Sequence, residues 1–427
     1  MNLKSRFFIF LAAFVLYASS AGAMLGTQST TPQYVYLANS FLQGKTYLAE
    51  LPNNTYDLIF YQNHWYVPGA MAPALLLLPF VAIFGLQTSD IMFGVIIGAI
   101  NIVLMYDLLD HLAVATKHST RNWLTLLFAA GTVNWWVSSL GTVWFNAQVV
   151  SVLFMTLFVR ETLINKNSYL CGLWLGLSIL SRPSTIFAAT FYITFVVLTI
   201  ENKKEIFRKL FPFFIMVGTM IVIMFLYNFL RFGSPFNFGY TYVQGDTELI
   251  TAYSKYGGFN PIFMPCNIYI SLLGLPNILG EPFPGTGQIC WHLIRGQYAF
   301  SNLFPFINPL GMSIFLTTPM FIYIFKAKIK IPLVKAAWIG ILSVMVPLWM
   351  YHNTGFIQFG YRYILDIIPI LFVLLFWGVP KIGLAEKFFI IISVFVNFIG
   401  MLVMFQVSFG SNWFAMWVKL LVPLFSK

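Results

Sequence analysis

Long apolar runs, separated by short polar segments, cover most of this chain. The first run begins at Phe7 and ends near Met24, and later ones include Ile91–Leu112 and Phe388–Val407. Such runs approach or exceed the ~18–20 residues with which a helix spans a bilayer. Because lipid offers the backbone no hydrogen-bond partner, each run is expected to form a helix. The pattern predicts an all-α fold, a polytopic transmembrane helical bundle of about 11–12 spans in a single domain over residues 1–427.

Shorter apolar stretches complete the pattern. Pro73–Gly85 is short and interrupted by proline, so we expect it to be re-entrant or packed on the outer side. Trp413–Phe425 is either a last span or an aromatic interfacial helix. The other expected spans are Leu124–Ser138, Phe145–Ile164, Tyr169–Leu180, Ile186–Ile200, Leu210–Leu230, Leu303–Phe325, Ala336–Tyr351 and the stretch that follows Arg362.

Basic residues set the expected orientation. Lys4 and Arg6 precede the first apolar run, and four more basic residues lie within 203–209. Lys and Arg concentrate in cytoplasmic loops, so we expect a cytoplasmic N-terminus and a multi-pass protein of the plasma (inner) membrane. The outer face then carries a first loop (25–70), a long loop (231–302) and a short loop (352–360). Together these loops are expected to form the active-site face.

The composition excludes several classes of protein. The chain is 59% hydrophobic and 9% charged, with a mean hydropathy of +0.80, which is typical of a membrane protein. Its net charge of +11 follows from the basic loops, so no nucleic-acid partner is predicted. Walker, dinucleotide-binding, His-Glu-x-x-His and nucleophile-elbow motifs are absent. Any chemistry would therefore take place at the membrane.

The cysteines show no metal-binding spacing. Cys171 lies in an apolar run, where packing explains it. Cys266 and Cys290 share the long loop and would form a disulfide if they meet in an oxidising compartment.

Three arginines stand at the ends of expected spans, namely Arg182, Arg231 and Arg362. A guanidinium stays charged and binds a phosphate or pyrophosphate with two parallel hydrogen bonds, so these side chains are candidate ligands for a lipid headgroup. Arg362 and Asp366 are four residues apart and would share one face of an α-helix, where they can pair. Snorkelling to the interface and a structural ion pair are the alternatives.

Asp57 is the candidate catalytic base in the first outer loop. A carboxylate there can take the proton of an attacking hydroxyl or bind a metal ion, and capping of a turn is the alternative. His64 and Tyr66 are candidate contacts to sugar or phosphate, although an interfacial aromatic belt explains them equally well. Tyr240 belongs to a segment rich in aromatic residues, Asn and Gly, which suits sugar stacking or a turn at the membrane surface.

Several short segments, in their order along the chain, resemble the GT-C superfamily of polytopic glycosyltransferases. The likeness is to bacterial family 39-like members, similar to protein O-mannosyltransferases and the lipid A aminoarabinose transferase. These segments are Tyr56-Asp57-Leu58, His64-Trp65-Tyr66, Pro73–Pro79, Leu180-Ser181-Arg182-Pro183, Tyr227–Pro235, Asn308–Ser313, and Phe359–Tyr363 with Asp366 and Pro369.

The resemblance implies inverting transfer of a sugar from a polyprenyl-phosphate donor to a lipid, glycan or protein acceptor on the extracytoplasmic face. It places Asp57 as the acidic residue that catalyses the transfer. Asp246, Tyr361 and Asp366 are further candidate substrate contacts. The family usually has its acid soon after the first helix, whereas Leu25–Tyr36 contains none. Glu50 or Asp246 are therefore alternatives to Asp57.

Two other functions remain open at this point. A transporter or flippase would handle the same lipid-linked sugar, and a relative without catalytic activity would act in an assembly. A cluster of charges on the outer face favours a transferase, whereas a path through both faces favours a transporter. No cofactor is implied apart from a possible divalent cation, and the expected partners are a polyprenyl-phosphate sugar, membrane lipid and an unidentified acceptor.

Overall fold

The fold is known from a computed structural model. It describes residues 3–69, 71–113, 118–245, 247–276, 308, 310–355, 357–379 and 381–416, with no account of the side chains of 247–249. Within these ranges the chain is helical apart from loops and one antiparallel hairpin, in which β1 (Ile59–Tyr61) pairs with β2 (His64–Tyr66). The predicted all-α class is confirmed.

Six helices among the described residues are long and apolar enough to cross a membrane. They are α1 (Leu3–Ala21, extended by a 3-10 turn to Met24), α4 (Asp90–Leu112), α7 (Val143–Leu163), α10 (Lys203–Phe232), α16 (Pro332–Trp349) and α18 (Leu384–Phe409). Shorter apolar helices are α3 (Ala72–Phe84), α8 (Ser168–Ile179), α9 (Ala189–Thr199), α12 (Met264–Ile268) and α17 (Ile368–Gly378). The protein is thus a polytopic integral membrane bundle.

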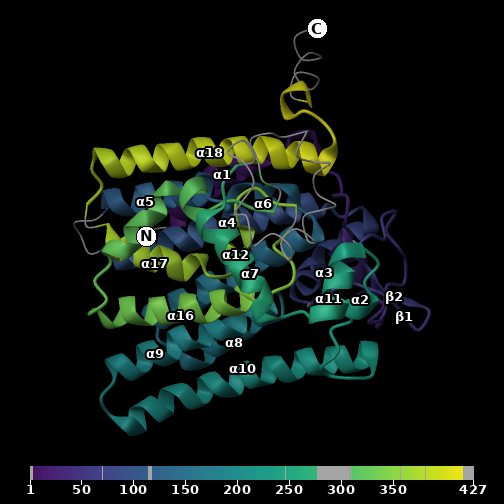
Figure 1. Ribbon diagram of the computed structural model, residues 1–427, viewed down its shortest axis with the longest axis horizontal. Helices are drawn as coiled ribbons and strands as arrows, with labels where there is room; N and C mark the ends of the chain where they lie inside the picture. Colours follow the sequence, from purple (N-terminus) through teal and green to yellow (C-terminus); the bar gives the residue numbers. More distant parts are fainter. Residues whose placement is uncertain are drawn as a thin grey trace.

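The helices form one bundle whose outer loops gather at one end. In Figure 1, α18 and α10 run along opposite edges, with α16, α9 and α8 between them. The elements of the first and long outer loops lie together at one end of the bundle: the β1–β2 hairpin, α2 (Gln33–Leu42) and α11 (Thr247–Tyr256). This arrangement agrees with the expectation that segments distant in sequence share one face.

Two helices illustrate how burial follows the hydrophobic pattern. α17 is apolar all round, and ten of its eleven residues are buried, as expected for a helix enclosed by others. α10 is buried mainly where it packs on α8, and it leaves Phe207, Val222 and Leu226 exposed. Exposed apolar side chains along a helix of this length suit contact with lipid.

Two expected spans are not continuous helices. The stretch Leu124–Ser138 is divided between α5 (His118–Ala130) and α6 (Asn134–Leu140). The expected span Leu303–Phe325 is replaced by the short α15 (Ile314–Thr317) and a 3-10 helix, η9 (Pro319–Lys326), while its first five residues lie outside the described ranges. Pro319 lacks the amide hydrogen that would continue an α-helix, so it begins the new element instead.

The segment after Tyr361 also differs from the expected α-helix. Arg362–Asp366 forms a 3-10 helix, η10, and only then does α17 begin. With three residues per turn, positions four apart point roughly 120° away from each other. The prediction that Arg362 and Asp366 share a face and pair is therefore wrong.

The cysteines differ in their bonding. Cys171 on α8 is free and buried, as its apolar run implied. Cys266 on α12 is disulfide-bonded, while Cys290 lies outside the described residues.

Candidate functional site

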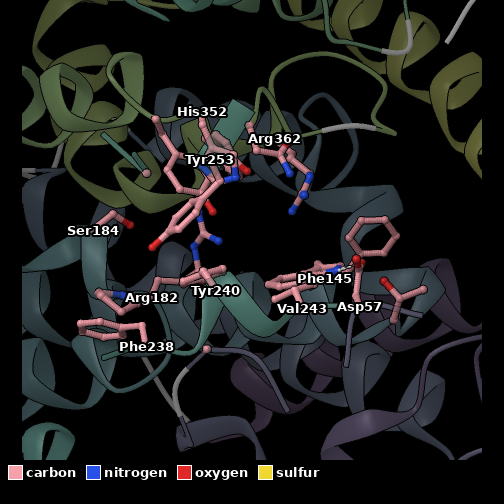
Figure 2. Close-up of a pocket in the computed structure, with 18 of the residues that line it drawn as sticks. Asp57, Phe145, Arg182, Ser184, Phe238, Tyr240, Val243, Tyr253, His352 and Arg362 are labelled. Carbon is pink, nitrogen blue, oxygen red and sulfur yellow. Dashed lines mark hydrogen bonds between the residues drawn. The ribbon is translucent and has the colours of Figure 1, made fainter. Parts of the chain in front are cut away.

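A cavity of about 920 Å³ lies where the outer loops meet the helix bundle. Figure 2 shows Asp57 and Phe145 on one side of it, Arg182 and Ser184 on the opposite side, and His352 and Arg362 along the edge between them. Its walls come from the first outer loop, the start of α7, the start of the 3-10 helix η3 (Pro183–Ala188), the long loop, the short loop and α18. Polar and charged side chains from segments far apart in the sequence therefore meet in this cavity.

Asp57 is held by contacts from two other parts of the molecule. Its backbone adopts the left-handed conformation (φ 66°), which Asp tolerates better than most residues. Its amide donates to the Gln244 carbonyl (2.7 Å), and the indole Nε1 of Trp144 donates to its Oδ2 (2.9 Å). A bridge between Ile59 and Val243 continues this pairing along the hairpin. The long loop and α7 thus fix the carboxylate at the cavity wall.

The turn before α7 brings Trp144 and Phe145 to the cavity. α6 ends at Gly141, whose φ of 73° suits glycine, and a Cβ there would lie only 2.5 Å from the Ile91 Cα. α7 begins two residues later, so its first turn faces the cavity. The close approach of α6 and α4 at this glycine sets where Trp144 meets Asp57.

Arg362 is a buried cation with no carboxylate partner among the described residues. It is only 4% exposed and lines the cavity. Its Nε donates to the Gly355 carbonyl (2.9 Å) and its Nη1 to Gln148 Oε1 (3.0 Å). A buried charge is costly unless it is paired, so a cation kept beside a cavity is a candidate ligand for an anion.

Two glutamines place Arg362. Gln148 on α7 also donates through Nε2 to the Arg362 carbonyl (3.1 Å), while the Arg362 amide donates to Gln358 Oε1 (2.8 Å). Neither glutamine was singled out from the sequence. A signal existed for Gln148, because an uncharged polar side chain inside an apolar span must find an internal partner.

Arg182 pairs with Asp366, which replaces the predicted pairing of Asp366 with Arg362. Its Nε and Nη2 each lie 3.1 Å from a carboxylate oxygen, and Ser184 Oγ donates to the same carboxylate (2.7 Å). Asp366 is fully buried and does not line the cavity, whereas Arg182 does. Arg182 thus presents a guanidinium whose charge is already compensated.

The edge between the arginines is aromatic. His352 is 6% exposed, its ring lies 5.2 Å from that of Tyr253 and 4.5 Å from that of Tyr351, and burial lowers its pKa to about 4. Burial also raises the pKa of Tyr240 and Tyr253, so both phenols stay protonated. His352 is the first residue of the short loop (352–360), in which the sequence singled out no candidate residue.

Arg231 is not brought to the cavity. It is 3% exposed, and it donates to the carbonyl of Val67 (3.0 Å) and to Asn228 Oδ1 (2.7 Å). Its guanidinium carbon lies 3.9 Å from the Tyr227 ring centroid and 4.7 Å from that of Phe232. The structure gives this arginine a packing role between α10 and the first outer loop.

Three other candidates also lie away from the cavity wall. His64 is exposed, with its ring 4.2 Å from that of Tyr47. Tyr66 is buried against Phe232. Tyr361 is fully buried behind the wall. The remaining candidate, Asp246, lies outside the described residues.

The described residues offer poor support for a bound cation. They contain no group of three or more His, Cys, Asp or Glu side chains arranged to hold a metal ion. Asp57 is the one carboxylate among the described lining residues, whereas Ca²⁺ and Mg²⁺ need several oxygen ligands.

Comparisons with known proteins give one distant likeness. No family model matches this sequence, and no curated protein sequence matches it. A crystal structure of ArnT from Cupriavidus metallidurans, bound to undecaprenyl phosphate, is similar with a TM-score of 0.47 and 11% sequence identity. The match covers 90% of this chain and 61% of that one, so the chain spans about three fifths of the length of that relative.

Proposed function

We propose that this protein is a GT-C-like membrane glycosyltransferase. It would transfer a sugar from a polyprenyl-phosphate donor to a lipid, glycan or protein acceptor on the extracytoplasmic face. The observation that carries this proposal is one cavity, at the outer-loop end of a membrane bundle, that holds both a carboxylate, Asp57, and a buried arginine without a carboxylate partner among the described residues, Arg362.

The arginine side of the cavity suits a lipid phosphate. Arg362 carries an uncompensated charge, and Arg182 adds a second guanidinium on the cavity wall. Charge-assisted hydrogen bonds from arginine to phosphate are short and strong. Met404 and Val407 of α18 and Leu348 of α16 line the same cavity, so an isoprenoid chain would have an apolar wall beside its phosphate.

Asp57 supplies the base. In the proposed reaction the acceptor hydroxyl attacks the anomeric carbon, and its proton passes to the Asp57 carboxylate. The bond from the anomeric carbon to the phosphate oxygen breaks, and its electron pair leaves with the polyprenyl phosphate. Arg362 and Arg182 stabilise the charge that develops there. A single displacement of this kind inverts the anomeric configuration.

The expected location is the plasma (inner) membrane, with the N-terminus in the cytoplasm. Basic residues flank the start of α1 and of α10, as the positive-inside rule requires for cytoplasmic ends. Disulfides persist in oxidising compartments, so the bonded Cys266 supports an extracytoplasmic long loop.

The test is sugar transfer from a synthetic polyprenyl-phosphate sugar by the purified protein in detergent. We expect Asp57→Asn to lower turnover by about 10²–10⁴-fold, as removal of a general base does. Glu50→Gln is the matched control, because Glu50 is exposed in the same loop and does not line the cavity. Loss of turnover in the control but not in Asp57→Asn would reassign the base.

The same purified protein, reconstituted in liposomes, distinguishes a transferase from a transporter. Wild-type protein in liposomes that moves intact lipid-linked sugar across the bilayer, and shows no turnover with any donor or acceptor, would contradict the transferase and support a transporter.

A further inference from the structure

One stretch of the cavity wall is polar but carries no charge. It consists of His352, Tyr253 and Tyr240, and in Figure 2 these residues lie near one another at the cavity edge. The rings of Tyr240 and Tyr253 are 6.1 Å apart, and those of Tyr253 and His352 are 5.2 Å apart. We call these three residues the aromatic subsite.

The aromatic subsite is built rigidly by two loops. The His352 amide donates to the Gly258 carbonyl (3.0 Å), and the Asn260 amide donates to the Met350 carbonyl (2.8 Å). Between these bonds, Phe259 and Tyr351 form a β-bridge. Tyr240 shares a hydrogen bond with Tyr351. The long loop that carries Tyr253 is thus fastened directly to the short loop that carries His352.

The imidazole of His352 interacts with the Gly258 backbone, but its Nδ1 nitrogen lacks a hydrogen-bond partner in the described part of the chain. The residue is only 6% exposed, and its Nδ1 atom is enclosed without a hydrogen-bond partner. A buried polar group left unsatisfied costs about 1–3 kcal/mol. A ligand hydroxyl that meets Nδ1 after the ring turns toward the cavity would recover part of that cost.

The chemistry of these side chains selects the ligand. A neutral imidazole and two protonated phenols both donate and accept hydrogen bonds, which matches hydroxyl groups. Their ring faces suit the apolar face of a saturated ring. A phosphate would instead prefer Arg362 and Arg182. A sugar with an ammonium group would be repelled by these arginines and would meet no carboxylate within the subsite itself.

We propose that His352, Tyr253 and Tyr240 form a separate subsite for the uncharged, hydroxylated ring of the donor sugar, while the two arginines hold its phosphate. This inference rests on the proposed function. It divides donor recognition between two walls of one cavity and makes a neutral sugar, rather than an amino sugar, the preferred substrate.

The experiment compares the affinity of the purified full chain for two synthetic lipids, polyprenyl phosphate and the same lipid carrying a neutral hexose. His352→Phe keeps an aromatic ring and removes both nitrogens. We expect it to lower affinity for the hexose lipid by about 10-fold, the value of one or two hydrogen bonds, and to leave affinity for the bare lipid within about 2-fold. Tyr253→Phe, which removes a single hydroxyl, is expected to act in the same direction with a smaller loss.

Two control variants accompany these measurements. His64→Phe alters an exposed histidine outside the cavity and should change neither affinity. Arg362→Gln should lower the affinity for both lipids by the same factor. Thermal unfolding of each variant shows that it is folded, and Tyr253→Phe keeps the test valid if His352→Phe does not fold.

Each contrary result has its own meaning. The subsite would be overturned if His352→Phe lost affinity for both lipids equally, or if neither aromatic variant lost affinity for either lipid. Both results would leave the proposed transferase function standing. Tighter binding of an amino-sugar lipid than of the hexose lipid would overturn the preference for a neutral sugar. Failure of the wild-type protein to bind either lipid would contradict the proposed function and the subsite with it.

Discussion

The end of α10 and the η10 turn each bury an arginine, yet the two regions use it differently. Arg231 is enclosed by backbone and amide oxygens and by the rings of Tyr227 and Phe232, and it lines no part of the cavity. Arg362 is just as buried, but it stands at the cavity wall with its position set by Gln148. Burial alone therefore does not distinguish an arginine enclosed by protein from one that faces a cavity.

What differs is the space beside the guanidinium. A protein that buries a charge without an ion pair must compensate it with hydrogen bonds or leave it for a ligand. At Arg231 the protein supplies acceptors for both terminal nitrogens and two stacking rings, while Nε lacks a partner among the described residues. At Arg362 part of the surroundings is an open cavity that also contains Asp57. The contrast predicts that one arginine contributes to stability and the other to activity.

The largest effect is expected at Arg362. Arg362→Gln removes the uncompensated charge and should lower sugar transfer by about 10²–10³-fold, the cost of losing one donor to a developing anion. The Gly355 carbonyl and Gln148 Oε1 lose their donor, but removal of a buried charge offsets part of that cost, so the unfolding temperature should fall less than in Arg231→Met. Steady-state transfer and thermal unfolding in detergent measure the two quantities. Unchanged transfer with a large loss of stability would make Arg362 a packing residue like Arg231.

His352 extends the comparison to a neutral group. Its pKa is 6.5 in the unfolded chain and about 4 in the folded one, so the unfolded state binds more protons between these values. The free energy of unfolding is therefore highest above pH 6.5, and this group lowers it by about 3 kcal/mol in total as the pH falls toward 4. Unfolding of wild type beside His352→Phe over this pH range isolates the contribution from those of the carboxylates. Parallel curves for the two proteins would refute the prediction.

Arg231 should show the opposite result to Arg362. Arg231→Met keeps much of the side-chain volume but leaves the Val67 carbonyl and Asn228 Oδ1 without their donor. An unsatisfied buried acceptor costs about 1–3 kcal/mol, so the unfolding temperature should fall. Transfer per folded molecule should stay close to wild type. A variant of normal stability and reduced turnover would place Arg231 in the binding machinery after all.

The smallest effect is expected at Trp144, which positions Asp57. Trp144→Phe keeps an aromatic ring and removes the indole donor to Asp57 Oδ2, which should lower transfer by up to about 10-fold. A carboxylate that accepts fewer hydrogen bonds holds its proton more tightly, so the acidic limb of the pH–rate profile should move to higher pH. A lower rate with an unmoved profile would indicate a purely steric role for the indole.

Much of the bundle could be predicted because a continuous apolar stretch is enough to indicate a membrane helix. The apolar runs at Ile91–Leu112 and Phe388–Val407 correspond to α4 and α18 within a few residues. The predictions of a continuous span failed where proline or a tight turn divides an apolar stretch, as at Pro319. Hydrophobicity reports that such a stretch is buried, but it does not report whether the backbone continues as one helix.

The sequence by itself determined that the chain forms a polytopic membrane bundle and that a few charges lie near the ends of its apolar helices, because both follow from the cost of placing polar groups in lipid. Tertiary structure alone decided the partner of each charge. Asp366 pairs with Arg182, 184 positions away, and Arg362 is placed by Gln148, 214 positions away. Such contacts depend on how separate helices pack, and the spacing of residues along one helix carries no information about them.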